Sequence, residues 1–264
     1  MNAGIREHVK DVLGRLAGMT GLYTRRFRSQ ATIVAFHRVN DQLAADGLTC
    51  SSAKFEAFLK FFRKHFRVMP LSALLASCRA GEYVGGTLVI TFDDGYRDNF
   101  ERAAPILRKL QLPATFFVTT GFIGSQLVPP WDTHLSQQPG WMNWDQVRAL
   151  ASMGFEIGSH TDSHLDLGTA NPEAIRADLV LSKRKLADAL GTPVEAFAYP
   201  FGGPEHISER SRDLVREAGF TCCMACHGGV NSGRPDPFDL NRIGIAEWFG
   251  TPDQFGFELL TGRA

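Results

Sequence analysis

The chain has 264 residues, a length that suits one large α/β domain. Hydrophobic residues make up 44% and charged residues 21%, as in a protein that buries a full core. Basic and acidic side chains number 28 each, so the balanced charge gives no reason to expect nucleic acid as a partner. No apolar run reaches the length of a membrane-spanning helix.

Residues 1–30 form a basic segment ahead of the predicted catalytic domain, which spans 31–264. An amphipathic helix of this kind can lie on an anionic membrane through residues 1–28, or it can pack on the domain with its basic residues solvated. Charged residues interrupt its apolar positions, so it does not read as a signal peptide, and a cytoplasmic location is expected, peripheral at the inner membrane face if the segment binds lipid. The residues that share one helical face are Ile5, Val9, Val12, Leu13 and Leu16.

After residue 30, short apolar runs alternate with amphipathic stretches. Such repeated units predict parallel strands with helices outside them, in a barrel or a doubly wound sheet, with the functional loops at the carboxyl ends of the strands. Pro105 is expected to kink the second helix, and the Asn171-Pro172 pair to begin the fourth. The predicted strands are 31–36, 87–92, 114–118, 155–158, 196–199, 220–224 and 243–245. The predicted helices are 52–66, 99–110, 145–153, 171–191 and 208–219.

The histidine in Phe36-His37-Arg38 ends the first predicted strand. A histidine at such a position can protonate a departing amine. A structural hydrogen-bonding role fits the residue equally well.

Two adjacent carboxylates, Asp93 and Asp94, follow the most apolar predicted strand in Thr91-Phe-Asp-Asp-Gly95. In a regular strand they would point to opposite faces. Gly95 indicates a turn of the backbone, so both carboxylates can face one cavity. The alternative is a helix cap, because an Asp before a Gly often begins a turn.

A pair of histidines follows the strand at 155–158, in Ser159-His160-Thr-Asp-Ser-His164. Histidines four residues apart can aim both rings at one point, which suits a divalent transition metal. The alternative is two surface or capping histidines. Together with the Asp93-Asp94 pair, one carboxylate and two imidazoles would leave metal positions open for water and substrate, while the second carboxylate acts as a base.

Cys223-Met-Ala-Cys226 has the spacing of half a zinc or redox site. A second half-site is missing, and the five cysteines of the chain are an odd number for a disulfide scaffold. A buried strand at 220–224, with cysteine acting as a small apolar residue, is the preferred interpretation.

Two of these motifs, Thr91–Gly95 and His160–His164, together with a third at Ala198-Tyr-Pro-Phe-Gly202, resemble the signature motifs of the polysaccharide deacetylases, the NodB-homology domain of carbohydrate esterase family 4. The resemblance runs from about His37 to Ile245. It implies an α/β fold, a distorted (β/α) barrel of about seven parallel strands in a single domain. It also implies a hydrolase that removes acetyl groups from the nitrogen of amino sugars, usually with zinc.

The resemblance also implies roles for individual residues. Asp93 would be the base that activates the attacking water. The backbone N–H near Phe201 would help hold the oxyanion, and Tyr199, Phe201 and Trp144 would contact the glycan. The implied ligands for Zn²⁺, or another divalent first-row transition metal, are Asp94, His160 and His164.

Two departures from the family pattern stand out. Ala198 occupies the position of an arginine that normally orients the catalytic aspartate, and no Leu-x-His motif lies near the C-terminus. The chain resembles instead a rearranged branch acting on poly-N-acetylglucosamine, in which an N-terminal strand ends in the proton-donating histidine, here His37. Arg242 either supplies the missing guanidinium or is a surface residue before an edge strand.

Two other functions compete with glycan deacetylation. The chain could be a glycan-binding relative without turnover, which the altered third motif keeps open, or a hydrolase of a non-sugar amide. The N-acetylated glycan could be a polysaccharide, an oligosaccharide or a lipid-linked precursor. Trp131 and Trp141, like Trp144, are candidates for stacking on its sugar rings, although an equally good interpretation of Trp144 is that it anchors its helix.

Overall fold

A computed structural model of the protein describes residues 3–262 and 264. Its strands are β1 (Gln30–Phe36), β2 (Arg38–Val39), β3 (Thr49–Cys50), β4 (Arg67–Val68), β5 (Thr87–Phe92), β6 (Thr115–Val118), β7 (Glu156–Ser159), β8 (Ala196–Ala198), β9 (Cys222–Met224), β10 (Asn231–Ser232) and β11 (Ile243–Gly244). Its α-helices are α1 (Ala3–Met19), α2 (Leu22–Arg26), α3 (Ser52–His65), α4 (Leu71–Ala80), α5 (Ala104–Leu110), α6 (Trp144–Ser152), α7 (Pro172–Leu190), α8 (Glu209–Glu217) and α9 (Pro252–Thr261).

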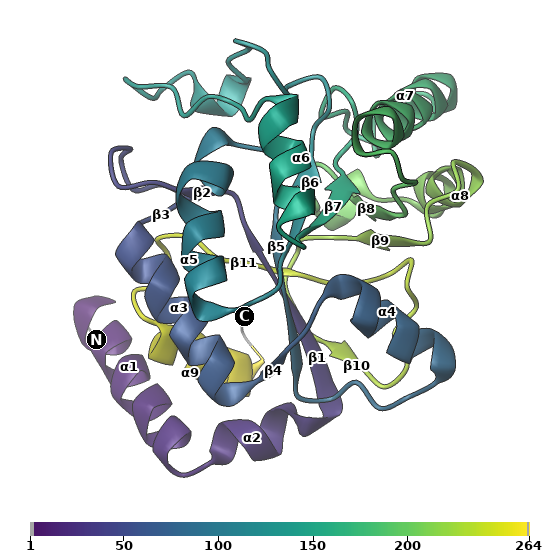
Figure 1. Ribbon diagram of the computed structural model, residues 1–264. Coiled ribbons are helices and arrows are strands. Elements are labelled where there is room, and N and C mark those ends of the chain that lie inside the picture. The colour runs from purple at the N-terminus through teal and green to yellow at the C-terminus, as the bar shows by residue number, and fades with distance from the viewer. Residues whose placement is uncertain (1–2, 263) are drawn as a thin grey trace.

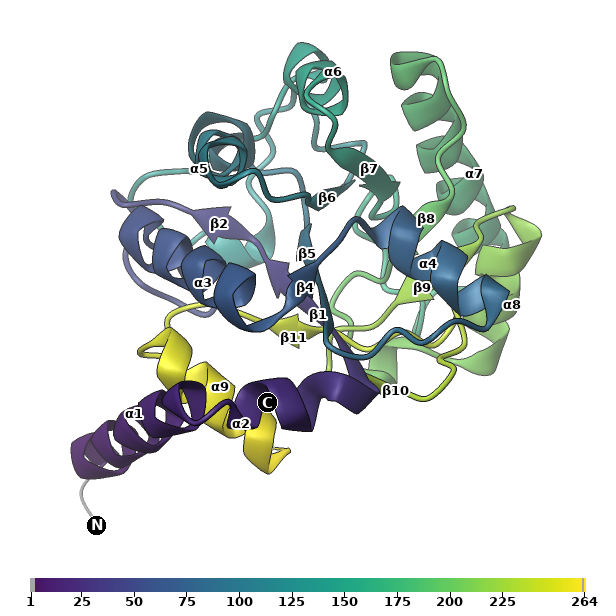
Figure 2. The same ribbon diagram turned by 60° about the horizontal axis from the view of Figure 1, so that its bottom comes forward.

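Nine strands form one curled sheet in the order β10-β1-β5-β6-β7-β8-β9, with β11 beside β1 and β4 beside β5 (Figure 1), and β2 and β3 pair in a separate two-stranded sheet. Neighbouring strands in the curled sheet are parallel except for β1 and β10. Helices surround the curled sheet (Figure 2). The predicted class, a distorted (β/α) barrel, is therefore confirmed, with strand carboxyl ends meeting at one edge.

Alternate residues of the central strands face opposite sides of the sheet. Val34 and Phe92 pack outward in the large cluster beneath α3, α5 and α6, whereas Ile33 and Val89 face inward, where α4 contributes Leu74. Burying each such side chain contributes roughly 1.5–3 kcal/mol. The inward set of β5 continues to its carboxyl end, which brings the next residues of the chain to the inside of the barrel.

Helix signals in the sequence agree with the observed ends. Asn171 caps α7 by accepting a hydrogen bond from the Ala174 N–H (2.9 Å), and Gly191 ends it with φ +70°. The predicted helix at 99–110 is not regular, since Asn99–Ala103 forms a π-helical turn before α5. Pro105 explains this departure. Its backbone nitrogen has no hydrogen to donate to the helix, and its ring crowds the preceding turn.

The N-terminal helix α1 lies outside the barrel against α9 (Figures 1 and 2). The helix therefore packs on the domain, while the predicted contact of this segment with a membrane and the division of the chain at residue 30 stay predictions. Among the residues that the structure describes, no helix combines the length and apolar character needed to cross a bilayer.

Candidate active site

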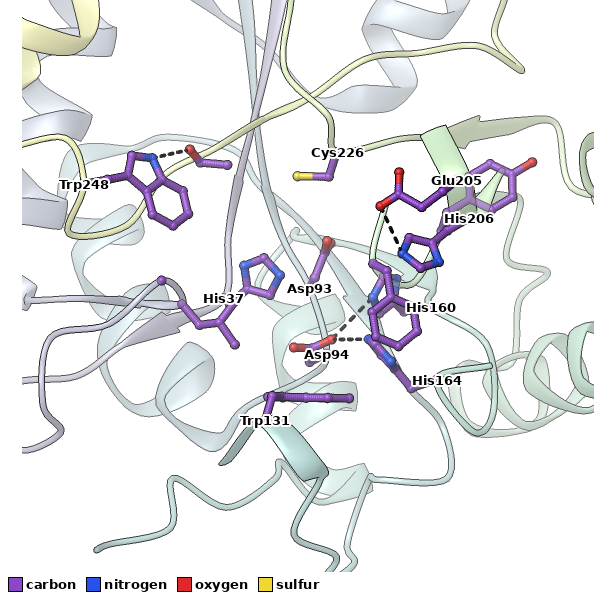
Figure 3. A pocket seen from close by; sticks show the side chains of 15 residues that line it. His37, Asp93, Asp94, Trp131, His160, His164, Glu205, His206, Cys226 and Trp248 are labelled. Carbon is purple, nitrogen blue, oxygen red and sulfur yellow. Dashed lines mark hydrogen bonds and ion pairs between the residues drawn. The ribbon is translucent and has the colours of Figure 1, made fainter. Parts of the chain in front are cut away.

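A pocket with a volume of about 510 Å³ lies at the carboxyl ends of the parallel strands. It is open enough for part of an oligosaccharide, and its walls come from loops that follow β1, β5, β7 and β8 (Figure 3). Seven of the nine side chains predicted to form the site line it: His37, Asp93, Asp94, His160, His164, Tyr199 and Phe201.

The two adjacent aspartates both face this pocket because the backbone leaves the strand geometry at the second one. Asp93 keeps the inward direction of β5, and Asp94 adopts a left-handed conformation with φ +71°. Gly95 follows with φ +93°, where an added Cβ would lie 3.0 Å from Ile123. A left-handed aspartate is sterically costly, and residues held in this way cluster at functional sites.

The side chains of Asp94, His160 and His164 converge on one point. Each offers a ligand atom within 4.8 Å of the others, and the Asp94 Oδ1 lies 3.4 Å from Nε2 of His160 and 3.3 Å from Nε2 of His164. In the described part of the chain, that buried oxygen has no hydrogen-bond partner. A buried carboxylate oxygen without a partner is costly unless a cation satisfies it, so this donor set fits a divalent transition metal.

A hydrogen-bonding contact and the backbone conformation orient the imidazole rings of the two histidines in the metal-binding cluster. Nδ1 of His160 lies 2.9 Å from the Ala198 carbonyl oxygen, and donation there leaves the Nε2 lone pair directed at Asp94. His164 adopts φ +58°, which turns its ring toward that of His160, with centroids 5.1 Å apart.

Electrostatics within the cluster keep Asp94 ionised. Burial alone would raise the pKa of Asp94, but the His160 and His164 rings outweigh burial and hold the pKa well below its ordinary value. Burial would lower the pKa of His160, yet Asp93 and then Asp94 raise it.

The second carboxylate, Asp93, is paired with a buried arginine. Arg242 donates from Nη1 to Oδ1 and from Nη2 to Oδ2 of Asp93, both at 2.7 Å. Its Nη1 also lies 3.1 Å from Thr91 Oγ1, and its Nε donates to the Ala225 carbonyl at 2.9 Å. Since the Arg242 side chain is fully buried, the surface alternative does not apply. Burial would raise the pKa of Asp93, but Arg242 and then His160 outweigh burial and lower it.

His37 follows β1 and lies in the pocket, across Asp93 and Asp94 from the other two histidines (Figure 3). The carbonyl of His37 accepts a hydrogen bond from the Asn99 side chain at 2.7 Å, which fixes its backbone. Burial lowers the pKa of His37, although both aspartates oppose this effect. The structure thus brings His37 to the side of the pocket that faces the carboxylates.

The third motif contributes two aromatic residues in different ways. Phe201 has φ +63°, exposes 51% of its side chain and presents its ring edge-on to His164 at 4.8 Å between centroids. Within the described chain, the Phe201 N–H donates no backbone hydrogen bond. Tyr199 lines the pocket but is buried, and it packs in the cluster with Phe197 and Leu214.

The structure does not bring Trp144 to the pocket, contrary to its predicted contact with the glycan. Asn143 caps α6, which places Trp144 in the first helical turn, where its ring packs against the large core cluster. Trp141 is also unavailable, because its ring is buried in a stack with Tyr96 at 4.6 Å. Trp131 is the tryptophan that lines the pocket near His164, with centroids 4.4 Å apart.

The pocket also contains residues that no sequence motif indicated. Glu205 and His206 form one wall, and His206 Nδ1 lies 2.8 Å from Asp166. Cys226 and Trp248 lie on the side opposite the metal-binding cluster (Figure 3). Cys222 and Cys223 are buried in β9, all five cysteines are free, and no cysteine joins a metal-binding group within the described residues.

The fold and this pocket define a barrel hydrolase with its site at the strand carboxyl ends. Residues 81–223, more than half of the chain, match the family described as polysaccharide deacetylase. The chain therefore belongs to the polysaccharide deacetylase family, as its motifs predict, and the predicted enzyme class, a polysaccharide N-deacetylase, is confirmed.

Individual relatives agree with this assignment. The poly-beta-1,6-N-acetyl-D-glucosamine N-deacetylase of Staphylococcus aureus (strain MRSA252) is 26% identical over 204 residues, which cover 75% of this chain and 68% of the relative. The deacetylase PplD of Streptococcus pyogenes has a similar fold, with a TM-score of 0.74 and 21% identity over 89% of this chain and 98% of PplD. IcaB from Ammonifex degensii gives a TM-score of 0.71 at 20% identity, with coverage of 89% and 98%.

Proposed function

We propose that this enzyme is a metal-dependent hydrolase that removes N-acetyl groups from the amino sugars of a polysaccharide, oligosaccharide or lipid-linked glycan. The observation that carries the proposal is the convergence of Asp94, His160 and His164 beside an arginine-paired Asp93 in one pocket. A divalent first-row transition metal held by these three side chains would polarise the amide carbonyl and make a water molecule easier to deprotonate.

Asp93 would act as the base in the first step, in which water attacks the acetyl carbon. Its carboxylate is held in one orientation by two hydrogen bonds from Arg242 and stays ionised, so it can accept a proton from the water that adds to the acetyl carbon. The Phe201 N–H would donate to the carbonyl oxygen as negative charge develops there.

His37 would act as the acid in the second step, in which the sugar amine leaves. The carbon–nitrogen bond breaks as acetate forms, and the sugar nitrogen needs a proton to leave as an amine. His37 lies across the carboxylates from the metal-binding cluster, where it can donate that proton. After these steps Asp93 carries the proton taken from water and His37 has lost one, so the first must release a proton and the second must regain one before the next turnover.

Aromatic walls suit a sugar substrate. The Trp131 ring lies beside His164 and the Phe201 ring lies beyond it, so the metal-binding cluster is flanked by two apolar faces. Pyranose rings present C–H faces that pack on such surfaces. The relative from Staphylococcus aureus is named for poly-β-1,6-N-acetylglucosamine, and we propose a glycan of N-acetylated glucosamine units as the substrate class.

Acetate release tests the proposal. The chelated and the metal-reconstituted protein would be incubated with β-1,6-linked and β-1,4-linked N-acetylglucosamine oligomers, with acetate and new free amines both measured. We expect equal amounts of acetate and amine, and only with metal. Glycan binding without acetate release would support the non-catalytic alternative, and full activity after chelation would overturn the metal mechanism.

The two adjacent aspartates give a matched pair of variants. Asp93→Asn keeps the size of the side chain but removes the base, so it should retain metal while turnover falls by about 10²–10⁴-fold. Asp94→Asn should bind metal weakly and recover part of its rate with added zinc. If Asp93→Asn is the metal-deficient variant, the assignment of the pair is wrong.

The cytoplasmic location expected from the N-terminal sequence stays a prediction.

A further inference from the structure

The N-terminal helix α1 is amphipathic, but it packs on the barrel through its polar and small residues. Lys10 pairs with Glu258 of α9 at 2.5 Å, and Asp11 accepts a hydrogen bond from Thr251. Gly14 lies so close to α9 that an added Cβ would be 1.9 Å from the Asp253 carbonyl oxygen. The face that a surface helix usually turns to water is therefore the face that this helix buries.

The apolar face of α1 is consequently turned outward. Its side chains recur at helical spacing, so they form one continuous ridge, about 20 Å long at 1.5 Å per residue. In Figures 1 and 2, α1 lies at the periphery with α9 on its inner side, and no other element covers the ridge. The exposed fractions are 54% for Ile5, 41% for Val9, 43% for Val12, 42% for Leu13, 51% for Leu16 and 76% for Met19.

Basic side chains border this apolar ridge. Arg6 follows Ile5 by one residue, or 100° around the helix, and Arg25 and Arg26 end the short helix α2, which begins at the exposed Leu22. These three arginines are exposed and join no ion pair within the part of the chain that is described. Positive charge beside an exposed apolar ridge matches the interfacial region of a membrane that contains anionic lipids.

We infer that α1 docks on an anionic membrane surface, with the apolar ridge at the boundary between headgroups and acyl chains. A convex ridge one helix wide suits a lipid layer, because fluid lipids can rearrange to contact the ridge on both sides. A second copy of the chain is a poorer occupant, because a two-fold contact along the ridge would bring arginines of the two copies together, Arg6 beside Arg6 in a parallel pair or beside Arg25 and Arg26 in an antiparallel one. The polar contacts with α9 would hold the barrel at the lipid surface, and the inference stands apart from the chemistry of the pocket.

Vesicle binding by the full chain tests this inference. Vesicles of phosphatidylcholine, with and without phosphatidylglycerol, would be titrated with the protein and sedimented. We expect binding only with phosphatidylglycerol. Leu13→Glu combined with Leu16→Glu should weaken it by about tenfold or more. Arg25→Gln and Arg26→Gln should each weaken it by about fivefold.

Val180→Glu is the matched control, because Val180 is 57% exposed on α7, on the far side of the barrel from α1 (Figure 1). It should bind vesicles as the unaltered protein does, and thermal melting should show that all the variants remain folded. Equal vesicle binding by the Leu13→Glu/Leu16→Glu variant would overturn the inference. So would a dimer in solution that this variant dissociates, since the ridge would then be an interface between copies.

Discussion

Arg242 donates two hydrogen bonds to the carboxylate of Asp93 across a separation of 149 residues in the chain. Both side chains are buried, so the pair is shielded from water and salt. Ala198, at the position where the family pattern has an arginine, is also buried but cannot provide such a contact. The guanidinium therefore reaches the base from the residue that precedes β11 rather than from β8.

Replacing Arg242 by lysine should separate charge from geometry. Lysine keeps the positive charge but cannot donate two parallel hydrogen bonds to one carboxylate. We expect turnover to fall by about 10²-fold with metal content unchanged. Rates and bound metal would be measured beside Arg176→Lys, a control on an exposed ion pair with Glu217. Normal turnover in Arg242→Lys would contradict the proposed orienting role.

Replacing His37 by glutamine should slow departure of the amine. The predicted loss is about 10²–10⁴-fold in turnover with normal metal content, because glutamine cannot donate a proton to the nitrogen. Anilide substrates, whose amines leave without full protonation, would show a smaller loss if His37 is the acid. An equal loss on sugar and anilide substrates would instead indicate that His37 supports the pocket structurally.

Much of the barrel could be predicted because its strands and helices carry strong local signals. The strand at Thr87–Phe92 has the predicted ends, and α7 begins and ends at its predicted cap and glycine. The two-residue strands β2, β3, β4 and β10 were not predicted, since two residues carry no periodicity. Helices α4 and α9 were also missed, although Gly81 and Gly262 mark their ends.

The residues of the site also divide into those that the sequence predicts and those that it does not. Asp93, Asp94, His160 and His164 follow strands, and the parallel sheet brings such residues to one edge. Trp144 does not reach the pocket because its ring anchors the start of α6 on the core, and an aromatic residue in that role cannot be told in sequence from one that lines a pocket. Trp131 reaches the pocket from a long loop between β6 and α6, and no local periodicity predicts where such a loop folds.

A buried polar network holds Trp131 at the pocket wall. The Trp131 indole donates to the Tyr96 hydroxyl at 2.9 Å, and this hydroxyl donates to Asp132 at 2.9 Å. Arg38 completes the network by donating to Asp132 and to Asp46, and its side chain is fully buried. Tyr96 thus links the aromatic wall to a charged group in the interior.

Tyr96→Phe should disconnect Trp131 from this network. The buried Asp132 carboxylate and the half-buried Trp131 indole would each lose a partner, so we expect the free energy of unfolding to fall by about 1–3 kcal/mol. The KM for an oligosaccharide should rise more than turnover falls, because the ring would be less well held while the metal-binding cluster is untouched. Denaturant unfolding and steady-state kinetics would be compared with Tyr83→Phe, an exposed tyrosine. An unchanged KM would show that Trp131 keeps its place without this contact.

The buried carboxyl of Asp98 lies beneath the loop that carries His37. It accepts hydrogen bonds from the Val39 N–H at 3.2 Å and from the side chains of Asn40 and Asn99, both at 3.1 Å. Burial raises the pKa of Asp98 from its ordinary value of 3.8 to about 6, although these hydrogen bonds oppose the shift. The folded protein therefore holds this proton more tightly than the unfolded chain does.

This difference predicts how stability depends on pH. A carboxyl with a raised pKa in the folded state favours folding below its unfolded pKa, and that contribution is lost as pH rises through about 6. The free energy of unfolding should therefore fall with pH, relative to Asp98→Asn, by up to about 3 kcal/mol between about pH 4 and 7. Urea unfolding of both proteins at several pH values measures the difference, and the variant cancels the titration of the other carboxylates. A difference that stays constant over this range would mean that Asp98 is ionised in the folded protein throughout.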